Sequence, residues 1–143
     1  MLLSPYLTNL KRRKKNLIKV KIPMKMPTLN DFIDACKIQR GSWNKGNSIK
    51  QSFQQQLYYY LYNLPVLKPP VRIHFVWIEK NKRRDLDNVS AIGRKFILDT
   101  LQLAGKLKND NLNYVVGLSD GVMFDSDYGV IIEITEEAKL DDS

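Results

Sequence analysis

Alternating hydrophobic and polar residues mark several β-strands along the chain. Residues 17–22 carry apolar side chains separated by Lys19 and Lys21, which predicts a strand with one solvent-exposed face. Residues 71–78 (VRIHFVWI) are rich in β-branched and aromatic side chains and give the strongest strand prediction. Residues 114–118 and 129–134 predict two more strands, joined by a turn-rich segment at residues 119–128.

Two helical segments are expected between the first two strands. Thr28 or Asn30 is a suitable N-cap for the first of them. Residues 48–63 form the second, and Gly41 and Gly46 mark an interruption between the two. The tyrosines of the second segment are compatible with packing or with stacking on nucleic-acid bases.

A third helix is predicted within residues 85–105, where apolar residues recur with helical spacing. Asp87 or Asn88 would cap its start and Gly105 would end it. Gly93 in mid-helix suggests the close approach of another backbone. The order of elements predicts an α/β (α+β) fold in which helices pack on a single mixed β-sheet.

The 143 residues are enough for one domain, which we place at residues 17–135 between a basic arm (residues 1–16) and an acidic tail (residues 136–143). Cys36 and His74 are the only cysteine and histidine, so a disulfide framework, a zinc module and a Ser-His-Asp triad are not expected. We expect His74 to lie on a sheet face in a structural role. No apolar run reaches the roughly 18 residues of a membrane span, and no signal peptide is evident, so we expect a cytoplasmic protein.

The charges are unevenly distributed around a formal net charge of +8. Residues 1–108 contain 22 Lys and Arg against 6 Asp and Glu, whereas residues 109–143 contain 1 against 9. A basic body of this kind fits a polyanionic partner, most simply nucleic acid, although a soluble protein with a high isoelectric point is an equally good explanation.

The sequence Arg83-Arg84-Asp85-Leu86-Asp87-Asn88 carries the most informative chemistry. Asp85 and Asp87 would project from the same side of an extended segment, next to a basic turn and a helix start. Such a pair either binds a divalent cation such as Mg²⁺, which prefers hard oxygen ligands, or serves only as turn and cap residues.

The helix that follows extends this pattern. Asn88, Lys95 and Asp99 fall within about 40° of one another on a helical wheel, although Lys95 and Asp99 would also suit a solvated i,i+4 ion pair. Asp110 follows the helix, and we expect the loop after Gly105 to carry it back beside Asp85 and Asp87. Three carboxylates and a lysine on a basic surface are suited to metal-assisted phosphodiester hydrolysis.

These motifs resemble the RusA family of Holliday junction resolvases, which are crossover junction endodeoxyribonucleases often carried by phages and prophages. The resemblance covers about residues 17–135. It rests on R-x-D-L-D-N at residues 83–88, on K-x-x-x-D-x-L-x-x-A-G at residues 95–105, on Asn109-Asp110, and more weakly on PTLNDFI at residues 27–33 and the strand at residues 130–134.

The resemblance implies a magnesium-dependent homodimer that nicks four-way DNA junctions symmetrically and leaves a 5′-phosphate and a 3′-hydroxyl. Asp85, Asp87 and Asp110 would bind the metal, and Lys95 would assist the chemistry. The gap from Asp87 to Lys95 is about one helical turn longer than in the shortest family members. The residues expected to contact DNA are Lys11, Arg12, Arg13, Lys14, Lys15, Lys82, Arg83, Arg84 and Asn88.

Two other functions fit the same sequence. A basic DNA- or RNA-binding protein without cleavage activity would share the charge and the tyrosines, but it would have no reason to place carboxylates where phosphates dock. A small interaction protein with an acidic protein partner is the third possibility.

Overall fold

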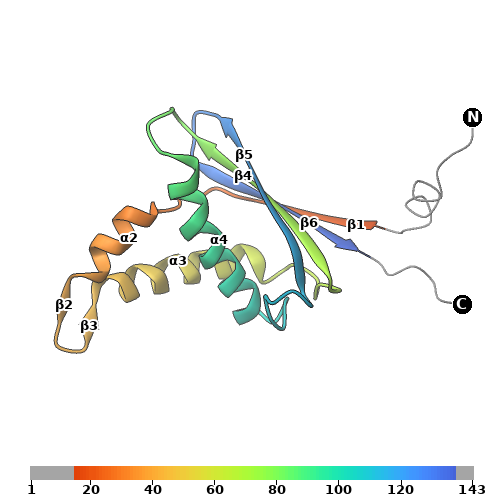
Figure 1. Cartoon of the computed structure of the whole chain (residues 1–143), viewed down its shortest axis with the longest axis horizontal. Helices are drawn as coiled ribbons and strands as arrows, with labels where there is room; N and C mark the ends of the chain where they lie inside the picture. Colours follow the sequence, from red (N-terminus) through yellow and green to blue (C-terminus); the bar gives the residue numbers. More distant parts are fainter. Residues whose placement is uncertain (1–14, 138–143) are drawn as a thin grey trace, which may run out of the picture.

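The computed structural model describes residues 15–137 (Figure 1). The elements run in the order β1 (Lys15–Ile22), α2 (Leu29–Cys36), β2 (Gln39–Arg40), β3 (Trp43–Asn44), α3 (Lys45–Leu61), β4 (Val71–Glu79), α4 (Leu86–Leu103), β5 (Val115–Phe124) and β6 (Gly129–Glu137). Thr28 caps α2 as predicted, and its hydroxyl accepts a hydrogen bond from the Asp31 amide.

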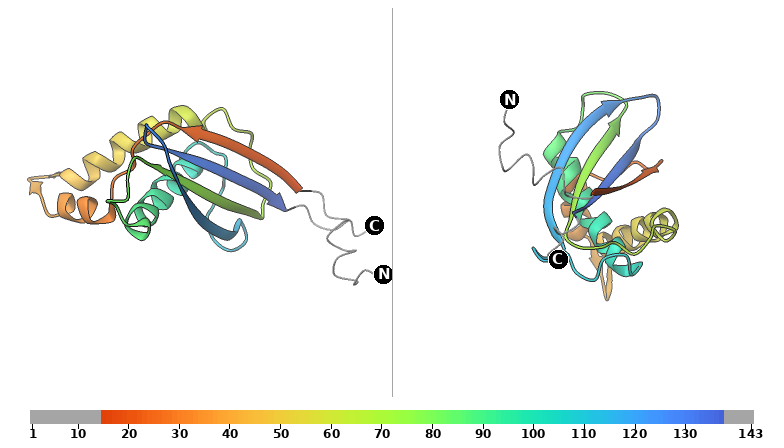
Figure 2. Two further views of the ribbon diagram at one scale, coloured as in Figure 1. Left: turned by 90° about the horizontal axis from the view of Figure 1, so that it is seen from above. Right: turned by 90° about the vertical axis from the view of Figure 1, so that its right-hand side faces the viewer.

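A four-stranded mixed sheet forms the body of the fold, with strand order β1-β6-β4-β5. Strands β4 and β5 are parallel and are connected through α4, whereas β6 runs antiparallel to both β1 and β4. The helices pack on one face of this sheet, and the other face is open (Figure 2). This arrangement confirms the predicted α+β architecture with a single mixed sheet.

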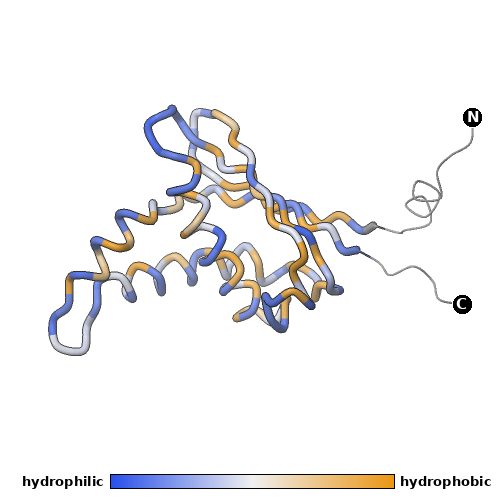
Figure 3. The backbone as a smooth tube through the Cα atoms, in the orientation of Figure 1, coloured by the Kyte–Doolittle hydropathy of each residue, from blue (hydrophilic) through white to orange (hydrophobic). Residues whose placement is uncertain are grey.

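The core lies between the sheet and its helices. Ile73, Phe75 and Trp77 on one face of β4 are almost completely buried. They belong to the same buried cluster as Leu61 of α3 and Phe96 of α4. The hydropathy trace alternates along the strands accordingly, and the loop from β4 to α4 is strongly hydrophilic (Figure 3). The most polar loop of the fold therefore leads directly into the helix that carries the candidate chemistry.

Strand β5 is longer than predicted, because it continues through Gly121 into the segment predicted to be turn-rich. Gly117 and Gly121 lie opposite Arg72 and Val76 in the parallel ladder. A Cβ on Gly117 would meet the Arg72 side chain at 2.6 Å, and one on Gly121 would meet the His74 ring at 3.4 Å. These glycines leave room for large side chains on β4, and the turn is confined to the short segment before Gly129.

Three other predictions differ from the structure. The sheet extends past the expected domain ends, since Asn16 donates a hydrogen bond to buried Glu136 at 2.7 Å. The N-cap of α4 is Asp85, two or three positions before the predicted Asp87 or Asn88. Gly93 makes room for the Trp77 ring, which a Cβ would meet at 2.5 Å, and not for another backbone.

Candidate nucleic-acid and metal site

The candidate site forms where β4 ends and α4 begins. Arg84 donates hydrogen bonds to both carboxylate oxygens of Glu79, at 2.7 and 2.9 Å, and to the carbonyl oxygen of Met26, at 2.6 Å. Its side chain is only 15% exposed, and that of Glu79 only 9%. This buried ion pair fixes the residue immediately before Asp85. Arg84, predicted to contact DNA, is therefore held inside the fold.

A second contact joins the starts of two helices. The backbone amide of Asn30 in α2 donates a hydrogen bond to Oδ1 of Asn88 in α4, at 3.2 Å. The two residues are 58 positions apart in the chain. The PTLNDFI segment and the RRDLDN segment, identified separately in the sequence, are thereby adjacent in space. Asn88, also predicted to contact DNA, has a structural partner.

Asp85 and Asp87 present free carboxylates at this helix start. Both residues are exposed, and Asp85 caps α4 without a side-chain hydrogen bond. Within residues 15–137, no ion pair involves either carboxylate, although the exposed cations Lys82 and Arg83 precede them in the chain. The positive end of the α4 dipole favours negative charge here. The two carboxylates are thus uncommitted acceptors beside unpaired cations.

A small apolar pocket of about 190 Å³ opens beside these carboxylates. Leu86, which separates the two aspartates, is 42% exposed, and Phe124 at the end of β5 is 52% exposed. The pocket is lined by Trp77, Glu79, Asn81, Lys82, Arg84, Leu86, Val89, Val122 and Phe124. The carboxylate pair therefore lies between a basic loop and an apolar surface.

Asp110 lies at the opposite end of α4, contrary to the expectation that its loop returns to the aspartate pair. Helix α4 has 18 residues, which corresponds to about 27 Å along its axis. The loop that contains Asp110 is held near the start of β4, where the Val71 amide donates to the Tyr114 carbonyl oxygen at 2.8 Å. Across residues 15–137 no three His, Cys, Asp or Glu side chains gather as a metal site. One chain therefore does not assemble the predicted trio.

Lys95 is also separated from the pair, by about 12 Å along the helix axis from Asp87. Its ammonium lies 3.6 Å from Oδ2 of Asp99, and Lys50 of α3 contacts the same oxygen at 3.1 Å. The polar stripe predicted on α4 exists, but its charges pair with each other. The predicted DNA contacts of Lys11, Arg12, Arg13 and Lys14 lie outside the described residues, as does the side chain of Lys15.

Two buried polar contacts near the site were not found from the sequence. Glu79 was assigned to a polar turn, and Asp120 to the turn-rich segment. Asp120 in fact accepts hydrogen bonds from the Trp77 indole at 3.0 Å and from Nε of Arg94 at 3.1 Å. Each contact joins residues of different elements, so no local pattern identifies it.

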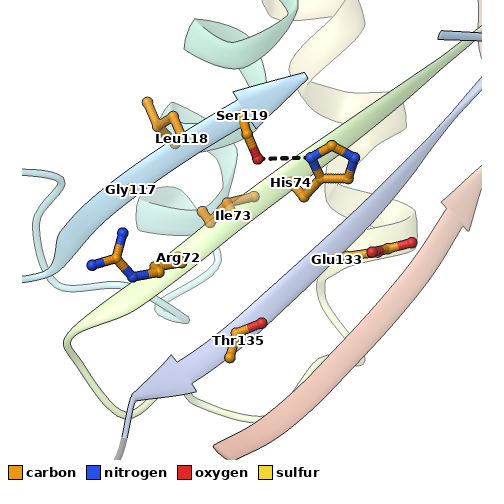
Figure 4. A pocket seen from close by; sticks show the side chains of 8 residues that line it. All are labelled: Arg72, Ile73, His74, Gly117, Leu118, Ser119, Glu133 and Thr135. Atoms are coloured by element: carbon orange, nitrogen blue, oxygen red, sulfur yellow. Dashed lines mark hydrogen bonds between the residues drawn. The ribbon is translucent and has the colours of Figure 1, made fainter. Parts of the chain in front are cut away.

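Another pocket, of about 270 Å³, lies on the open face of the sheet (Figure 4). It is lined by Arg72, Ile73, His74, Gly117, Leu118, Ser119, Glu133 and Thr135. Nδ1 of His74 and Oγ of Ser119 lie 2.7 Å apart, so the histidine has a partner within the sheet, as the structural prediction for it requires. Glu133 lies opposite His74 on β6 and pairs with Lys19 at 3.9 Å.

The α3 tyrosines form an exposed aromatic surface near the far end of α4. Tyr59 is 74% exposed, and the rings of Tyr58 and Tyr62 stack with centroids 6.0 Å apart. Leu103 at the end of α4 is 66% exposed, and it lines a hollow together with Tyr58. These tyrosines are therefore not part of the core of the described chain, which leaves interface packing or base stacking as their predicted roles.

The donors at the start of α4 fit a hard divalent cation only in part. The two carboxylates are oxygen donors of the type that Mg²⁺ uses. Mg²⁺ commonly binds one or two protein carboxylates and retains several waters. Asp87 lies within α4 while Asp85 caps it, so the pair does not share the extended segment predicted for it.

Comparisons with known proteins add little to this description. No protein-family model and no curated protein matches the sequence. A solved structure titled "Crystal structure of HypE-HypF complex" is similar at a TM-score of 0.33 and 11% identity, over 94% of this chain and 38% of that one. The chain thus spans well under half the length of that protein. No helix within residues 15–137 has the length and apolar character to cross a membrane.

Proposed function

We propose that this protein is a magnesium-dependent endonuclease that nicks branched DNA, of the RusA-like type that resolves four-way junctions. The observation that supports the proposal most is that the carboxylates of Asp85 and Asp87 are exposed and unpaired within the described chain, although Lys82 and Arg83 are close in sequence. A purely structural role would favour pairing these charges, whereas metal binding requires the carboxylates to be free.

Asp85 and Asp87 would hold the metal ion, with water completing the coordination. A bound Mg²⁺ polarises the phosphate and lowers the pKa of an attacking water. In the hydrolysis, the water oxygen forms a bond to phosphorus and the bond from phosphorus to O3′ breaks. The leaving O3′ takes up one proton of the water and becomes the 3′-hydroxyl, and the other proton is lost to solvent as the 5′-phosphate forms.

The protein's own residues would position the metal-binding carboxylates and neutralise the charge of the DNA phosphates. Arg84 holds the backbone before Asp85 through its ion pair with Glu79. Asn88 holds α4 against the start of α2. Lys82 and Arg83 are exposed and would contact backbone phosphates, which bind cations without regard to sequence. DNA phosphates would thus be brought to the carboxylates by charges that precede them in the same loop.

We infer that a second copy of the chain supplies Asp110. Asp110 is exposed at the far end of α4, so a single chain keeps it away from the pair. In a two-fold dimer with α4 helices running in opposite directions, one copy's far end lies beside the other's start. The exposed Tyr58, Tyr62 and Leu103 at that end provide apolar surface for such an interface. Two identical sites would then act on two strands.

A non-catalytic DNA- or RNA-binding protein is the second candidate. It is favoured by the separation of Asp110 from Asp85 and Asp87, because an incomplete carboxylate set binds metal weakly. The basic loop would then bind phosphates, and the aspartates would serve as helix cap and first-turn residues. Either function would have the protein act on nucleic acid, and we propose the cytoplasm of a bacterial or phage-infected cell as its location.

A nicking assay distinguishes the two candidates. The purified full chain is incubated with an end-labelled synthetic four-way junction in the presence and absence of Mg²⁺. We expect paired nicks that need Mg²⁺ and that Asp87→Asn abolishes. Asp34→Asn is the matched control, because Asp34 is exposed in α2 and pairs only with Lys37, at 3.6 Å. Binding without nicks under all metal conditions would favour the non-catalytic protein.

A further inference from the structure

Positive charges also gather around one aromatic ring beside the candidate site. Nζ of Lys25 lies 4.7 Å from the centre of the Tyr128 ring, Nζ of Lys80 lies 5.4 Å from it, and the Arg84 guanidinium carbon lies 5.3 Å from it. These residues come from the β1–α2 connection, the β4–α4 loop and the β5–β6 loop. The three segments lie together at one end of the sheet (Figure 1).

The charge of this cluster is only partly balanced. Arg84 is neutralised by Glu79, with which it forms a bidentate ion pair. Lys25 and Lys80 are exposed, and within the described chain no carboxylate oxygen lies within 4.0 Å of either ammonium. The carboxylate of Asp125, in the same loop as Tyr128, accepts a hydrogen bond from the Ser126 amide at 2.7 Å. Lys25 and Lys80 therefore remain near the Tyr128 ring as cations without a carboxylate partner in the described chain.

A nucleic-acid strand has both features that match this surface. Its phosphates are anions spaced along the backbone, and its bases have flat faces that stack on aromatic side chains. A protein acidic segment would match the lysines but would leave the ring unused. The adjacency of Arg84 to Asp85 in the chain places the surface next to the carboxylate pair.

We propose that Lys25, Lys80 and Tyr128 form a subsite for the DNA strand that leads to the carboxylate pair. The lysines turn toward backbone phosphates, and the face of the half-buried Tyr128 ring that they leave stacks on an unpaired base near the branch point. This inference rests on the proposed function, because it identifies how branched DNA is held at the same site.

The lysines are tested through the salt dependence of binding. Affinity for a fluorescein-labelled four-way junction is measured by anisotropy in EDTA, so that no cleavage occurs. For Lys25→Ala and Lys80→Ala we expect the slope of log affinity against log salt to fall by about 1 per lysine. Lys37→Ala is the matched control, since Lys37 is 72% exposed and lies at the other end of α2. An unchanged slope in the double variant would overturn the proposal.

The ring is tested by comparing two substitutions at one position. Tyr128→Phe retains an aromatic face, so affinity should stay within twofold of wild type. Tyr128→Ala removes the stacking surface, so affinity should fall about tenfold. Thermal unfolding of both variants shows whether the fold persists. Equal affinities for Tyr128→Ala and wild type would overturn the stacking role.

Failure of this inference is distinguishable from failure of the proposed function. If wild type nicks the junction and the lysine and tyrosine variants bind it normally, the subsite is wrong and the nuclease stands. If wild type does not bind the junction at all, both are wrong.

Discussion

The guanidinium of Arg84 contacts both carboxylate oxygens of Glu79, and this pair joins the end of β4 to the start of α4. A third hydrogen bond, to the Met26 carbonyl oxygen, adds the connection that leads to α2. One arginine thus ties together three segments at the candidate site. Several properties of the protein should depend on it.

Replacing Arg84 by alanine should destabilise the protein. The variant leaves the Glu79 carboxylate buried without a cation, which costs about 3 kcal/mol of unfolding free energy. Arg84→Lys retains the charge but loses the bidentate geometry, and it should lie between wild type and Arg84→Ala. Urea denaturation measures the unfolding free energies of wild type, Arg84→Lys and Arg84→Ala. A loss below about 1 kcal/mol for Arg84→Ala would contradict a structural role for this ion pair.

Asn88→Ala should loosen the contact between α2 and α4. It removes the acceptor of the Asn30 amide, a hydrogen bond worth about 1 kcal/mol. Asn88→Asp keeps an oxygen acceptor at the same place and should retain most of the stability. Hydrogen exchange of the Asn30 amide reports on the contact directly. Equal exchange rates in wild type and Asn88→Ala would show that the bond does not form in solution.

Gly93→Ala should destabilise the helix-to-sheet packing even though alanine favours helices by about 1 kcal/mol. The new methyl would lie 2.5 Å from the Trp77 ring, and overpacking of this kind costs about 1 to 3 kcal/mol. The double variant Gly93→Ala with Trp77→Phe should recover part of the loss, because the smaller ring leaves space. A Gly93→Ala protein more stable than wild type would show that the ring moves aside without cost.

Much of the fold could be predicted because its signals are local. The alternation in residues 71–78 and the helical stripe before Gly105 each reflect burial of one face, and both elements are present. The predicted strand ends at residue 118, because the segment that follows, with Gly121, resembles a turn when read alone. The role of Gly121 depends on the His74 side chain of the neighbouring strand, which no local pattern contains.

The candidate site was predictable in its residue types and less so in its geometry. The carboxylates of Asp85 and Asp87 were located at a helix start because cap and first-turn acids have a local signature. The path of the loop that carries Asp110 depends on packing at the far end of the sheet. The inward orientation of Arg84 likewise depends on the burial of Glu79. The charged residues that follow Glu79 in the sequence predict an exposed turn there instead.

The most direct test of the account mixes two inactive variants. Asp87→Asn and Asp110→Asn carry different tags, are expressed together, and the mixed dimer is purified through both tags. If each site combines Asp87 of one copy with Asp110 of the other, the mixed dimer has one intact site, and it should nick one strand of a four-way junction in Mg²⁺ while each variant alone stays inactive. An inactive mixed dimer beside an active wild type would contradict the shared site, and a wild type that binds the junction without nicking it would contradict the nuclease itself.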